Sequence, residues 1–155
     1  MLEETVGKLL MEKQLTIACA ESCTGGLLTS CLTDVEGSSA YVMGSVVSYT
    51  NEVKESLVGV KHETLVTHGA VSEATAREMA EGIRHVIGTA LGVGITGIAG
   101  PGGGTETKPV GLVYIAVAGD KGTTVKKNIF HGSRMENKRS SVEKALEMLH
   151  AYLYQ

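Results

Sequence analysis

Short apolar stretches alternate along this sequence with longer segments of helical periodicity. The stretches LTIACA at 15–20 and LGVGIT at 91–96 have the composition of short buried strands. Between them, apolar residues recur at helical spacing, most clearly within 72–89. Helices that separate the early strands, followed by a late hairpin, favour a layered α/β domain with a mixed sheet.

Apolar periodicity and turn residues predict where the individual elements lie. Helices are predicted at 2–14, 24–35, 51–60, 72–89 and 134–153, with a short helical turn at 62–69. Strands are predicted at 15–20, 41–50 and 91–96, and as a hairpin of 111–119 and 123–132. Asn51 is the expected N-cap of its helix.

The size of the chain predicts one domain. Its 155 residues, 43% of them hydrophobic, are enough to bury a sizeable core. No linker, repeat or low-complexity stretch interrupts the sequence, so we expect a single domain over 1–155. No apolar run reaches the ~18–20 residues of a membrane span, and the amphipathic start is unlike a signal peptide. We therefore expect a cytoplasmic protein with no membrane contact.

Charge and cysteine content argue against several kinds of partner. The formal net charge is −3 and the basic residues do not cluster, which argues against nucleic-acid binding and against an anionic membrane surface. The sequence has an odd number of cysteines, namely Cys19, Cys23 and Cys31, which favours reduced thiols over a disulfide framework. No H-x-x-x-H or C-x-x-C spacing occurs, so no dedicated metal site is expected.

Ser22 lies where the first predicted strand meets the next helix, in the turn ESCTGG at 21–26. The helix would leave the N–H groups of Thr24, Gly25 and Gly26 unpaired, and such donors suit an oxyanion or a phosphate. Ser22 is therefore a candidate nucleophile. The alternative is that its hydroxyl only caps the helix.

Lys54 and Tyr49 follow the second predicted strand. A lysine can act as the base for a serine when burial or neighbouring cations lower its pKa. The alternatives are a solvated lysine on a helix face and a tyrosine packed in the core. Cys23 is a second possible nucleophile, but no histidine lies in a comparable turn to activate it, so packing is the alternative role.

A glycine-rich segment follows the strand at 91–96. GVGITG at 92–97 matches G-x-G-x-x-G, but its glycines fall inside the strand and no helix follows, so it is not a dinucleotide-binding fingerprint. Lys108 does not follow the glycines in a G-K-[ST] arrangement, which excludes a Walker loop. The loop at 97–110, entered through Thr96, is either a ligand-facing segment or a flexible connection.

Arg134 and Arg139 are the candidate phosphate ligands. Both lie at the start of the last predicted helix, and a guanidinium group binds phosphate through two parallel hydrogen bonds. The alternative for each is a solvated surface charge. The five histidines are scattered, and we expect them to be structural or on the surface.

Taken together, six stretches of the sequence resemble the CinA C-terminal domain family. They are AESCTGG at 20–26, GSSAY at 37–41, VVSYTNEVKESLVGV at 46–60, HGAVSEATAREMAEG at 68–82, TGIAGPGGGTETKPVGLVY at 96–114 and HGSR at 131–134. They follow one another in the family's order, from about residue 3 to the end.

The resemblance implies a three-layer α/β/α fold with a mixed, mostly parallel sheet. It also implies the activity of a nicotinamide-nucleotide amidohydrolase, which converts nicotinamide mononucleotide to nicotinate mononucleotide and ammonia without a metal or organic cofactor. Many relatives carry this domain behind a larger N-terminal one, so the resemblance implies a short form here. Self-association into a homo-oligomer is expected as well.

The functional positions of the family fall on residues already considered. The nucleophilic serine falls on Ser22, the base lysine on Lys54 and the motif tyrosine on Tyr49, which are the expected catalytic residues. The residue before G-I-A-G-P falls on Thr96, and the arginine of the G-x-R segment falls on Arg134. The expected substrate-binding residues are Glu21, Thr24, Gly25, Thr96, Gly97, Gly100, Arg134 and Arg139.

In the expected mechanism, neutral Lys54 takes the proton of Ser22, Ser22 attacks the carboxamide, and water hydrolyses the resulting ester. Tyr49 orients Lys54, while Arg134 and the glycine loop hold the phosphate. Two other functions stay open. One is a non-catalytic nucleotide- or partner-binding module, and the other is a hydrolase of a different small amide or ester.

Overall fold

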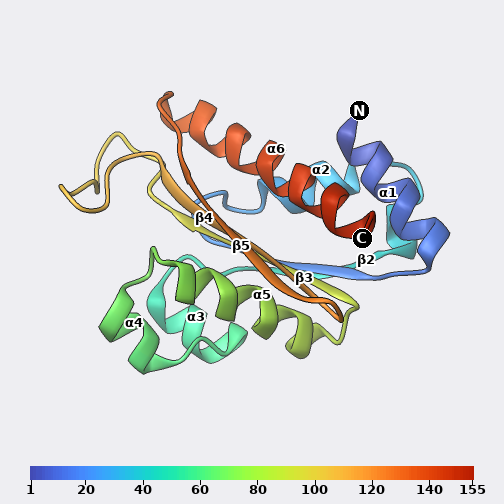
Figure 1. The fold of residues 1–155 in the computed structure, drawn as a ribbon, viewed down its shortest axis with the longest axis horizontal. Helices are drawn as coiled ribbons and strands as arrows, with labels where there is room; N and C mark the ends of the chain where they lie inside the picture. Colours follow the sequence, from blue (N-terminus) through green and yellow to red (C-terminus); the bar gives the residue numbers. More distant parts are fainter.

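The computed structural model describes residues 1–155 and places a five-stranded sheet between two layers of helices (Figure 1). The strands are β1 (Ile17–Glu21), β2 (Val42–Val47), β3 (Leu91–Gly97), β4 (Leu112–Gly119) and β5 (Gly122–Ile129). The helices are α1 (Leu2–Lys13), α2 (Leu27–Thr33), the single 3-10 turn η1 (Ser38–Ala40), α3 (Asn51–Val58), α4 (His62–His68), α5 (Glu73–Ile87) and α6 (Arg134–Leu153). The expected three-layer α/β fold is confirmed.

The sheet has the strand order β2-β1-β3-β4-β5. β1 pairs in parallel with β2 and with β3, while β4 runs antiparallel to both β3 and β5. Four strands therefore point the same way, as expected for a mixed, mostly parallel sheet. Because β1, β2 and β3 are parallel, their carboxyl ends lie together at one end of the sheet, where sites of α/β proteins form.

Both faces of the sheet are buried. α1, α2 and α6 cover one face, and α3, α4 and α5 cover the other (Figure 1). In β1, Ile17 and Cys19 belong to the core on the first face, whereas Ala18 and Ala20 belong to the core on the second. A strand that is buried on both sides has a continuous apolar sequence, which is what LTIACA shows.

Gly92 and Gly94 in β3 allow α5 to lie close to the sheet. A Cβ atom at Gly92 would overlap the main-chain oxygen of Ala80, and one at Gly94 would overlap that of Ala76. Glycine in a strand interior commonly marks such a close approach. The first two glycines of the G-x-G-x-x-G pattern therefore reflect helix–sheet packing, whereas a Cβ at Gly97 would overlap the main-chain oxygen of Leu112 in β4. Both findings agree with the rejection of the pattern as a nucleotide fingerprint.

The predicted start of the second helix is wrong. α2 begins at Leu27 and not near Thr24. Gly25 and Gly26 adopt left-handed φ angles of 60° and 100°, which are incompatible with a right-handed helix and are accessible to glycine at little cost. The chain therefore makes a tight turn before α2, and the serine of ESCTGG sits in that turn.

The second strand is also shorter than predicted. β2 ends at Val47, which leaves 48–50 as a loop at the carboxyl end of the sheet. Thr50, and not Asn51, caps α3, because its hydroxyl accepts a hydrogen bond from the Val53 N–H at 3.3 Å. This cap fixes where α3 starts.

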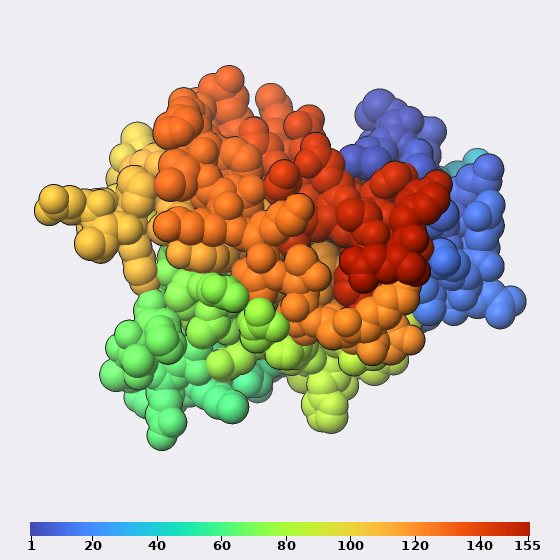
Figure 2. Space-filling view, in the orientation of Figure 1, coloured from blue at the N-terminus to red at the C-terminus, as the bar shows by residue number.

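The glycine-rich loop after β3 projects from one end of the molecule (Figures 1 and 2). Its position follows from β3, which delivers it to the same end as the turns after β1 and β2. None of the helices is both long enough and apolar enough to cross a membrane.

Candidate active site

Ser22 directly follows β1, at the carboxyl end of the sheet. Its N–H donates to the main-chain oxygen of Ile95 in β3 at 3.0 Å, and its own carbonyl accepts from the Gly25 N–H at 3.1 Å. These bonds hold the turn on both sides of the serine. Ser22 is 8% exposed, and its side chain does not cap α2. The helix-cap interpretation is therefore wrong.

Lys54 reaches Ser22 from α3. Its Nζ lies 3.0 Å from the Ser22 hydroxyl, 2.8 Å from the main-chain oxygen of Ser48 and 3.1 Å from that of Tyr49. Lys54 is 1% exposed, and no carboxylate forms a salt bridge with it. The interpretation of Lys54 as a solvated lysine is therefore wrong.

The three oxygens around Nζ match the bonding capacity of a neutral amine. A neutral amine has two N–H donors and one lone pair, whereas an ammonium has three donors and no acceptor. The carbonyls of Ser48 and Tyr49 can only accept, so they take the two N–H groups. The lone pair is then left for the hydroxyl of Ser22, which can donate. This arrangement suits a lysine that removes a proton from Ser22.

Burial lowers the pKa of Lys54, because the charged form loses its hydration. An ionised Cys23 would oppose this shift. Burial, however, raises the pKa of Cys23 to about 11, so its thiol stays protonated and uncharged near neutral pH. Cys23 is for the same reason a poor nucleophile.

Ser22 and Lys54 lie in a cavity of about 270 Å³. Its walls come from the turn after β1, from the segments around Tyr49 and 70–71, from the end of β3 with the glycine loop, and from the start of α6. The predicted site residues that line it are Ser22, Tyr49, Lys54, Thr96, Gly97, Gly100 and Arg134. The protein has no group of three or more His, Cys, Asp or Glu side chains placed to hold a metal ion.

Arg134 and Tyr49 form one wall of the cavity. The Arg134 guanidinium donates to the main-chain oxygen of Gly100 at 2.7 Å and to the Tyr49 hydroxyl at 3.3 Å. Tyr49 is 59% exposed, so it is not a core residue. We expected its side chain to orient Lys54, but its main-chain carbonyl makes that contact and its hydroxyl contacts Arg134.

Thr96 braces the opposite side of the cavity. It is buried at the end of β3, and its hydroxyl donates to the main-chain oxygen of Ala70 at 2.7 Å. This bond ties the segment after α4 to the sheet. Ala70 and Val71 thereby become part of the cavity wall, which the sequence had not indicated.

Four residues predicted to bind substrate do not line the cavity. Glu21 is fully buried, and its carboxylate accepts hydrogen bonds from the Thr24 hydroxyl and from the first main-chain N–H groups of α2. Glu21 and Thr24 therefore hold the turn together from inside. Gly25 and Arg139 are exposed on the surface.

Lys138, which was not among the predicted site residues, lies beside the turn that carries Ser22. A Cβ atom at Gly25 would lie 3.9 Å from the Lys138 Nζ. Lys138 is one helical turn after Arg134 on α6, so the two cations share a face, whereas Arg139 lies about 100° further round. The sequence could have indicated Lys138, because a residue four positions after Arg134 lies on the same face of the helix.

Three main-chain N–H groups of the turn have no partner within the protein. They belong to Cys23, Thr24 and Gly26, whereas the N–H of Gly25 is used by the Ser22 carbonyl. The first N–H groups of α2 are also occupied, that of Leu27 by the Thr24 carbonyl and those of Leu28 and Thr29 by Glu21. The predicted donor set is thus wrong at Gly25, and the turn itself, not the helix, offers donors for an anion.

The sequence matches the family model of the CinA C-terminal domain over residues 1–153. The chain belongs to the CinA C-terminal domain family. The match spans every segment that contributes to the cavity around Ser22 and Lys54.

Curated members of the CinA family are close in sequence. A competence-damage inducible protein of Acetivibrio thermocellus is 49% identical over 152 residues, which cover 98% of this chain and 37% of that protein. One from Clostridioides difficile is 55% identical over 133 residues, which cover 86% of this chain and 32% of that protein. The chain thus spans about a third of the length of these relatives.

Solved structures of the CinA superfamily have the same fold. The competence damage-inducible protein A of Klebsiella pneumoniae superimposes with a TM-score of 0.96 at 33% identity, covering 99% of this chain and 96% of that one. A competence/damage inducible protein of Agrobacterium tumefaciens superimposes with a TM-score of 0.92 at 41% identity, covering 100% of this chain and 97% of that one.

Proposed function

We propose that this protein hydrolyses the carboxamide of nicotinamide mononucleotide to nicotinate mononucleotide and ammonia. The observation that carries the proposal is the buried Lys54 amine, which lies 3.0 Å from the Ser22 hydroxyl and otherwise bonds only to two carbonyl oxygens. Membership of the CinA family, together with the resemblance to its stand-alone amidohydrolases, supports the choice of substrate.

Acylation begins when the Lys54 lone pair takes the proton of Ser22. The Ser22 oxygen then forms a bond to the carboxamide carbon, and the carbonyl oxygen becomes an oxyanion. Of the unpaired N–H groups of the turn, the one that belongs to a cavity-lining residue is that of Cys23, so it is the proposed donor for that charge. When the C–N bond breaks, the leaving nitrogen receives the proton from Lys54 and departs as ammonia.

Deacylation repeats the same proton transfers with water. Lys54, neutral again, takes a proton from a water molecule that attacks the ester carbon. The bond between that carbon and the Ser22 oxygen breaks, and the proton returns from Lys54 to Ser22. The products are nicotinate mononucleotide and the free serine, so one water is consumed for each ammonia released.

The phosphate of the substrate is proposed to bind between Arg134 and Lys138. Arg134 uses only two of its five N–H donors within the protein, on Gly100 and Tyr49, and Lys138 lies one helical turn away. A guanidinium and an ammonium on one helix face can together hold a dianion. Because all three cysteines are free thiols, a reducing compartment such as the cytoplasm is the proposed location.

Ammonia release tests the proposal. The wild-type protein should release one ammonia per nicotinamide mononucleotide, and nicotinamide riboside, which lacks the phosphate, should react far more slowly. Calorimetry with the mononucleotide is measured in parallel. Binding of the mononucleotide without any ammonia release would indicate a non-catalytic module and overturn the proposal. Turnover of other amides without turnover of the mononucleotide would indicate a different hydrolase.

A further inference from the structure

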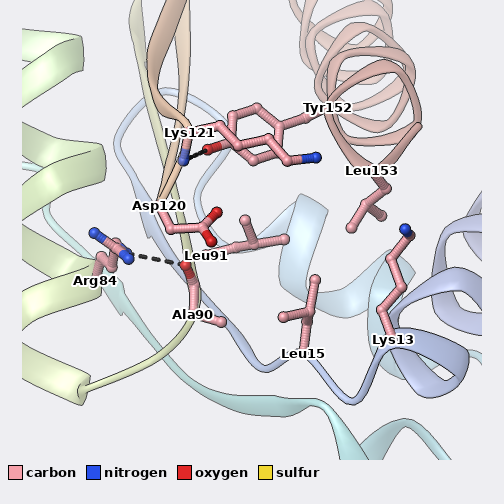
Figure 3. Close-up of a pocket in the computed structure, with 9 residues that line it drawn as sticks. All are labelled: Lys13, Leu15, Arg84, Ala90, Leu91, Asp120, Lys121, Tyr152 and Leu153. Atoms are coloured by element: carbon pink, nitrogen blue, oxygen red, sulfur yellow. Dashed lines mark hydrogen bonds between the residues drawn. The ribbon is translucent and has the colours of Figure 1, made fainter. Parts of the chain in front are cut away.

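A second cavity lies at the opposite end of the sheet from Ser22. It has a volume of about 320 Å³ and is built where the amino ends of β1 and β3 meet the turn between β4 and β5 (Figure 3). The two cavities are separated by the length of β3, which at ~3.3 Å per residue is about 20 Å. A ligand in the second cavity is therefore remote from the serine and lysine of the first.

The walls of this cavity are apolar on the inside. Leu91, Tyr152 and Leu153 are buried, and Leu15 and Ala90 are half-buried beside them. They come from β3, the end of α6 and the segments before β1 and β3, so four parts of the chain form one apolar wall (Figure 3). Such a wall suits an apolar body of one or two rings, and the volume falls within the range of small-molecule sites.

The rim of the cavity carries more positive than negative charge. Lys13, Arg84 and Lys121 are three cations against the single carboxylate of Asp120, and none of the four forms a salt bridge with another side chain. The Lys121 Nζ donates one of its three N–H groups to the main-chain oxygen of Gln155, which leaves two for an anion. The Nε of half-buried Arg84 donates to the main-chain oxygen of Ala90 at 2.9 Å, and its two terminal nitrogens bond to no protein atom. This bond fixes the guanidinium and leaves the four N–H donors of its terminal nitrogens for an anion.

Lys121 and Tyr152 are held together at the same rim. The Lys121 N–H donates to the Tyr152 hydroxyl at 3.0 Å, and that hydroxyl donates to the main-chain oxygen of Gly122 at 3.1 Å. The Lys121 Nζ lies 5.9 Å from the centre of the Tyr152 ring. The aromatic wall and one of the cations are therefore positioned by the same contacts, and Figure 3 shows both side chains beside Asp120.

We propose that this cavity is a binding site for a small amphipathic anion, namely a phosphate or carboxylate carried on an apolar, ring-sized body. The anionic group contacts Arg84 and Lys121, and the apolar body packs on Leu91, Tyr152 and Leu153. The site is separate from the proposed catalytic site and needs none of its residues.

Calorimetry with 1-naphthyl phosphate as the probe tests this site, with 1-naphthol and inorganic phosphate as matched halves of the probe. We expect 1-naphthyl phosphate to bind at least tenfold more tightly than either half, because only the whole molecule uses both the wall and the rim. Absence of binding, or equal binding of inorganic phosphate, would overturn the proposal.

Variants locate the bound probe. Arg84→Gln should weaken binding about tenfold, as expected for the loss of hydrogen bonds to a charged group. Lys121→Gln should weaken it as well, whereas Asp120→Asn should strengthen it, and both of these positions are exposed. Arg77→Gln on the same helix is the matched control.

The Arg134→Gln variant separates the two cavities. It should leave the affinity for 1-naphthyl phosphate unchanged, because Arg134 lies at the first cavity. If Arg134→Gln abolishes binding while Arg84→Gln does not, the probe occupies the candidate active site and the proposal of a second site is wrong. Circular dichroism of every variant confirms that the fold is retained in each comparison.

Discussion

Lys54 is placed by α3 among oxygen atoms that carry no full charge. A buried ammonium normally requires a carboxylate partner, and its absence here leaves burial as the main influence on the amine. The two carbonyls that accept its N–H groups also aim its lone pair at Ser22. The loop at 48–50 therefore sets the position of the amine, while burial lowers its pKa.

Turnover should rise with pH if neutral Lys54 is the base. Below the lowered pKa of Lys54 the rate should fall about tenfold per pH unit, and above it the rate should be constant. Cys23→Ala should keep the same acidic limb, because the protonated thiol contributes no charge. The measurement is kcat/KM for ammonia release across the pH range. A flat acidic limb, or a limb that moves by a unit in Cys23→Ala, contradicts this account.

Ser48→Ala should make the protein more stable. Ser48 is fully buried, and its hydroxyl has no hydrogen-bond partner. A buried unpaired hydroxyl costs ~1–3 kcal/mol, so its removal should raise the free energy of unfolding by about 1 kcal/mol. The main-chain carbonyl that holds Lys54 remains, so turnover should not change.

Urea denaturation measures the effect of Ser48→Ala, and Ser45→Ala is the matched control. The Ser45 hydroxyl donates to the main-chain oxygen of Cys19 at 2.9 Å, and its oxygen lies 2.8 Å from the Thr29 hydroxyl oxygen. Its removal should therefore lower stability. A loss of stability in Ser48→Ala similar to that in Ser45→Ala would show that the Ser48 hydroxyl is not unpaired in solution.

At the scale of the elements, Glu21 joins β1 to α2. Its carboxylate accepts from the Thr24 hydroxyl at 2.7 Å, from the N–H groups of Leu28 and Thr29 at 2.9 Å each, and from the Thr29 hydroxyl at 2.6 Å. A negative group at the start of a helix is also favoured by the helix dipole. Glu21 therefore sets the orientation of the turn that carries Ser22.

Glu21→Gln should destabilise the protein. The Gln side chain accepts hydrogen bonds only through its carbonyl oxygen, because its other terminal group is an NH2 donor. Some of these buried hydrogen bonds are therefore lost, at a cost of about 3 kcal/mol. Denaturant unfolding measures the change, with Glu12→Gln on the exposed side of α1 as the control that should have little effect. Unchanged stability in Glu21→Gln, with only a raised KM, would instead support the original prediction that Glu21 binds substrate.

Apolar periodicity located the elements because it reports burial, but it could not locate their ends. The start of α2 depends on the left-handed Gly25 and Gly26 and on a carboxylate in the preceding strand. Both the glycines and the carboxylate lie before the apolar residues whose helical spacing predicted this helix. For the same reason Thr50 was missed as the cap of α3, since the neighbouring Asn51 is an equally good capping residue by type.

At the scale of the whole molecule, parallel strands explain why so much of the site was predictable. β1, β2 and β3 deliver Ser22, the segment of Tyr49 and Lys54, and Thr96 to one end of the sheet. The contribution of α6 was harder to predict, because the angle at which a helix crosses the sheet is set by packing. The predicted Arg139 does not line the cavity, whereas Lys138, one residue earlier on α6, lies beside the turn that carries Ser22.

The two edges of the sheet differ in a way that bears on self-association. The edge strand β2 contains no charged residue and exposes Met43 and Val47, whereas the other edge strand, β5, carries Lys126 and Lys127. Charged side chains protect an edge from pairing, and their absence favours it. We therefore propose that a homo-oligomer forms through β2.

Met43→Lys should weaken that association. A lysine on the free edge places like charges opposite each other when two copies of β2 pair. Sedimentation velocity should show the wild type as an oligomer and Met43→Lys shifted toward the monomer. Thr124→Lys on β5 is the control and should sediment as the wild type does. A monomeric wild type, or an unchanged Met43→Lys, contradicts pairing through β2.

Ammonia release from nicotinamide mononucleotide by Ser22→Ala tests the central claim most directly, with Ser48→Ala as the matched serine control. Both serines lie within hydrogen-bond distance of the Lys54 amine, one through its hydroxyl and the other through its main-chain carbonyl. The account predicts that Ser22→Ala stays folded and loses at least a thousandfold in rate, while Ser48→Ala keeps the wild-type rate. Ammonia release by Ser22→Ala at the wild-type rate would contradict the account.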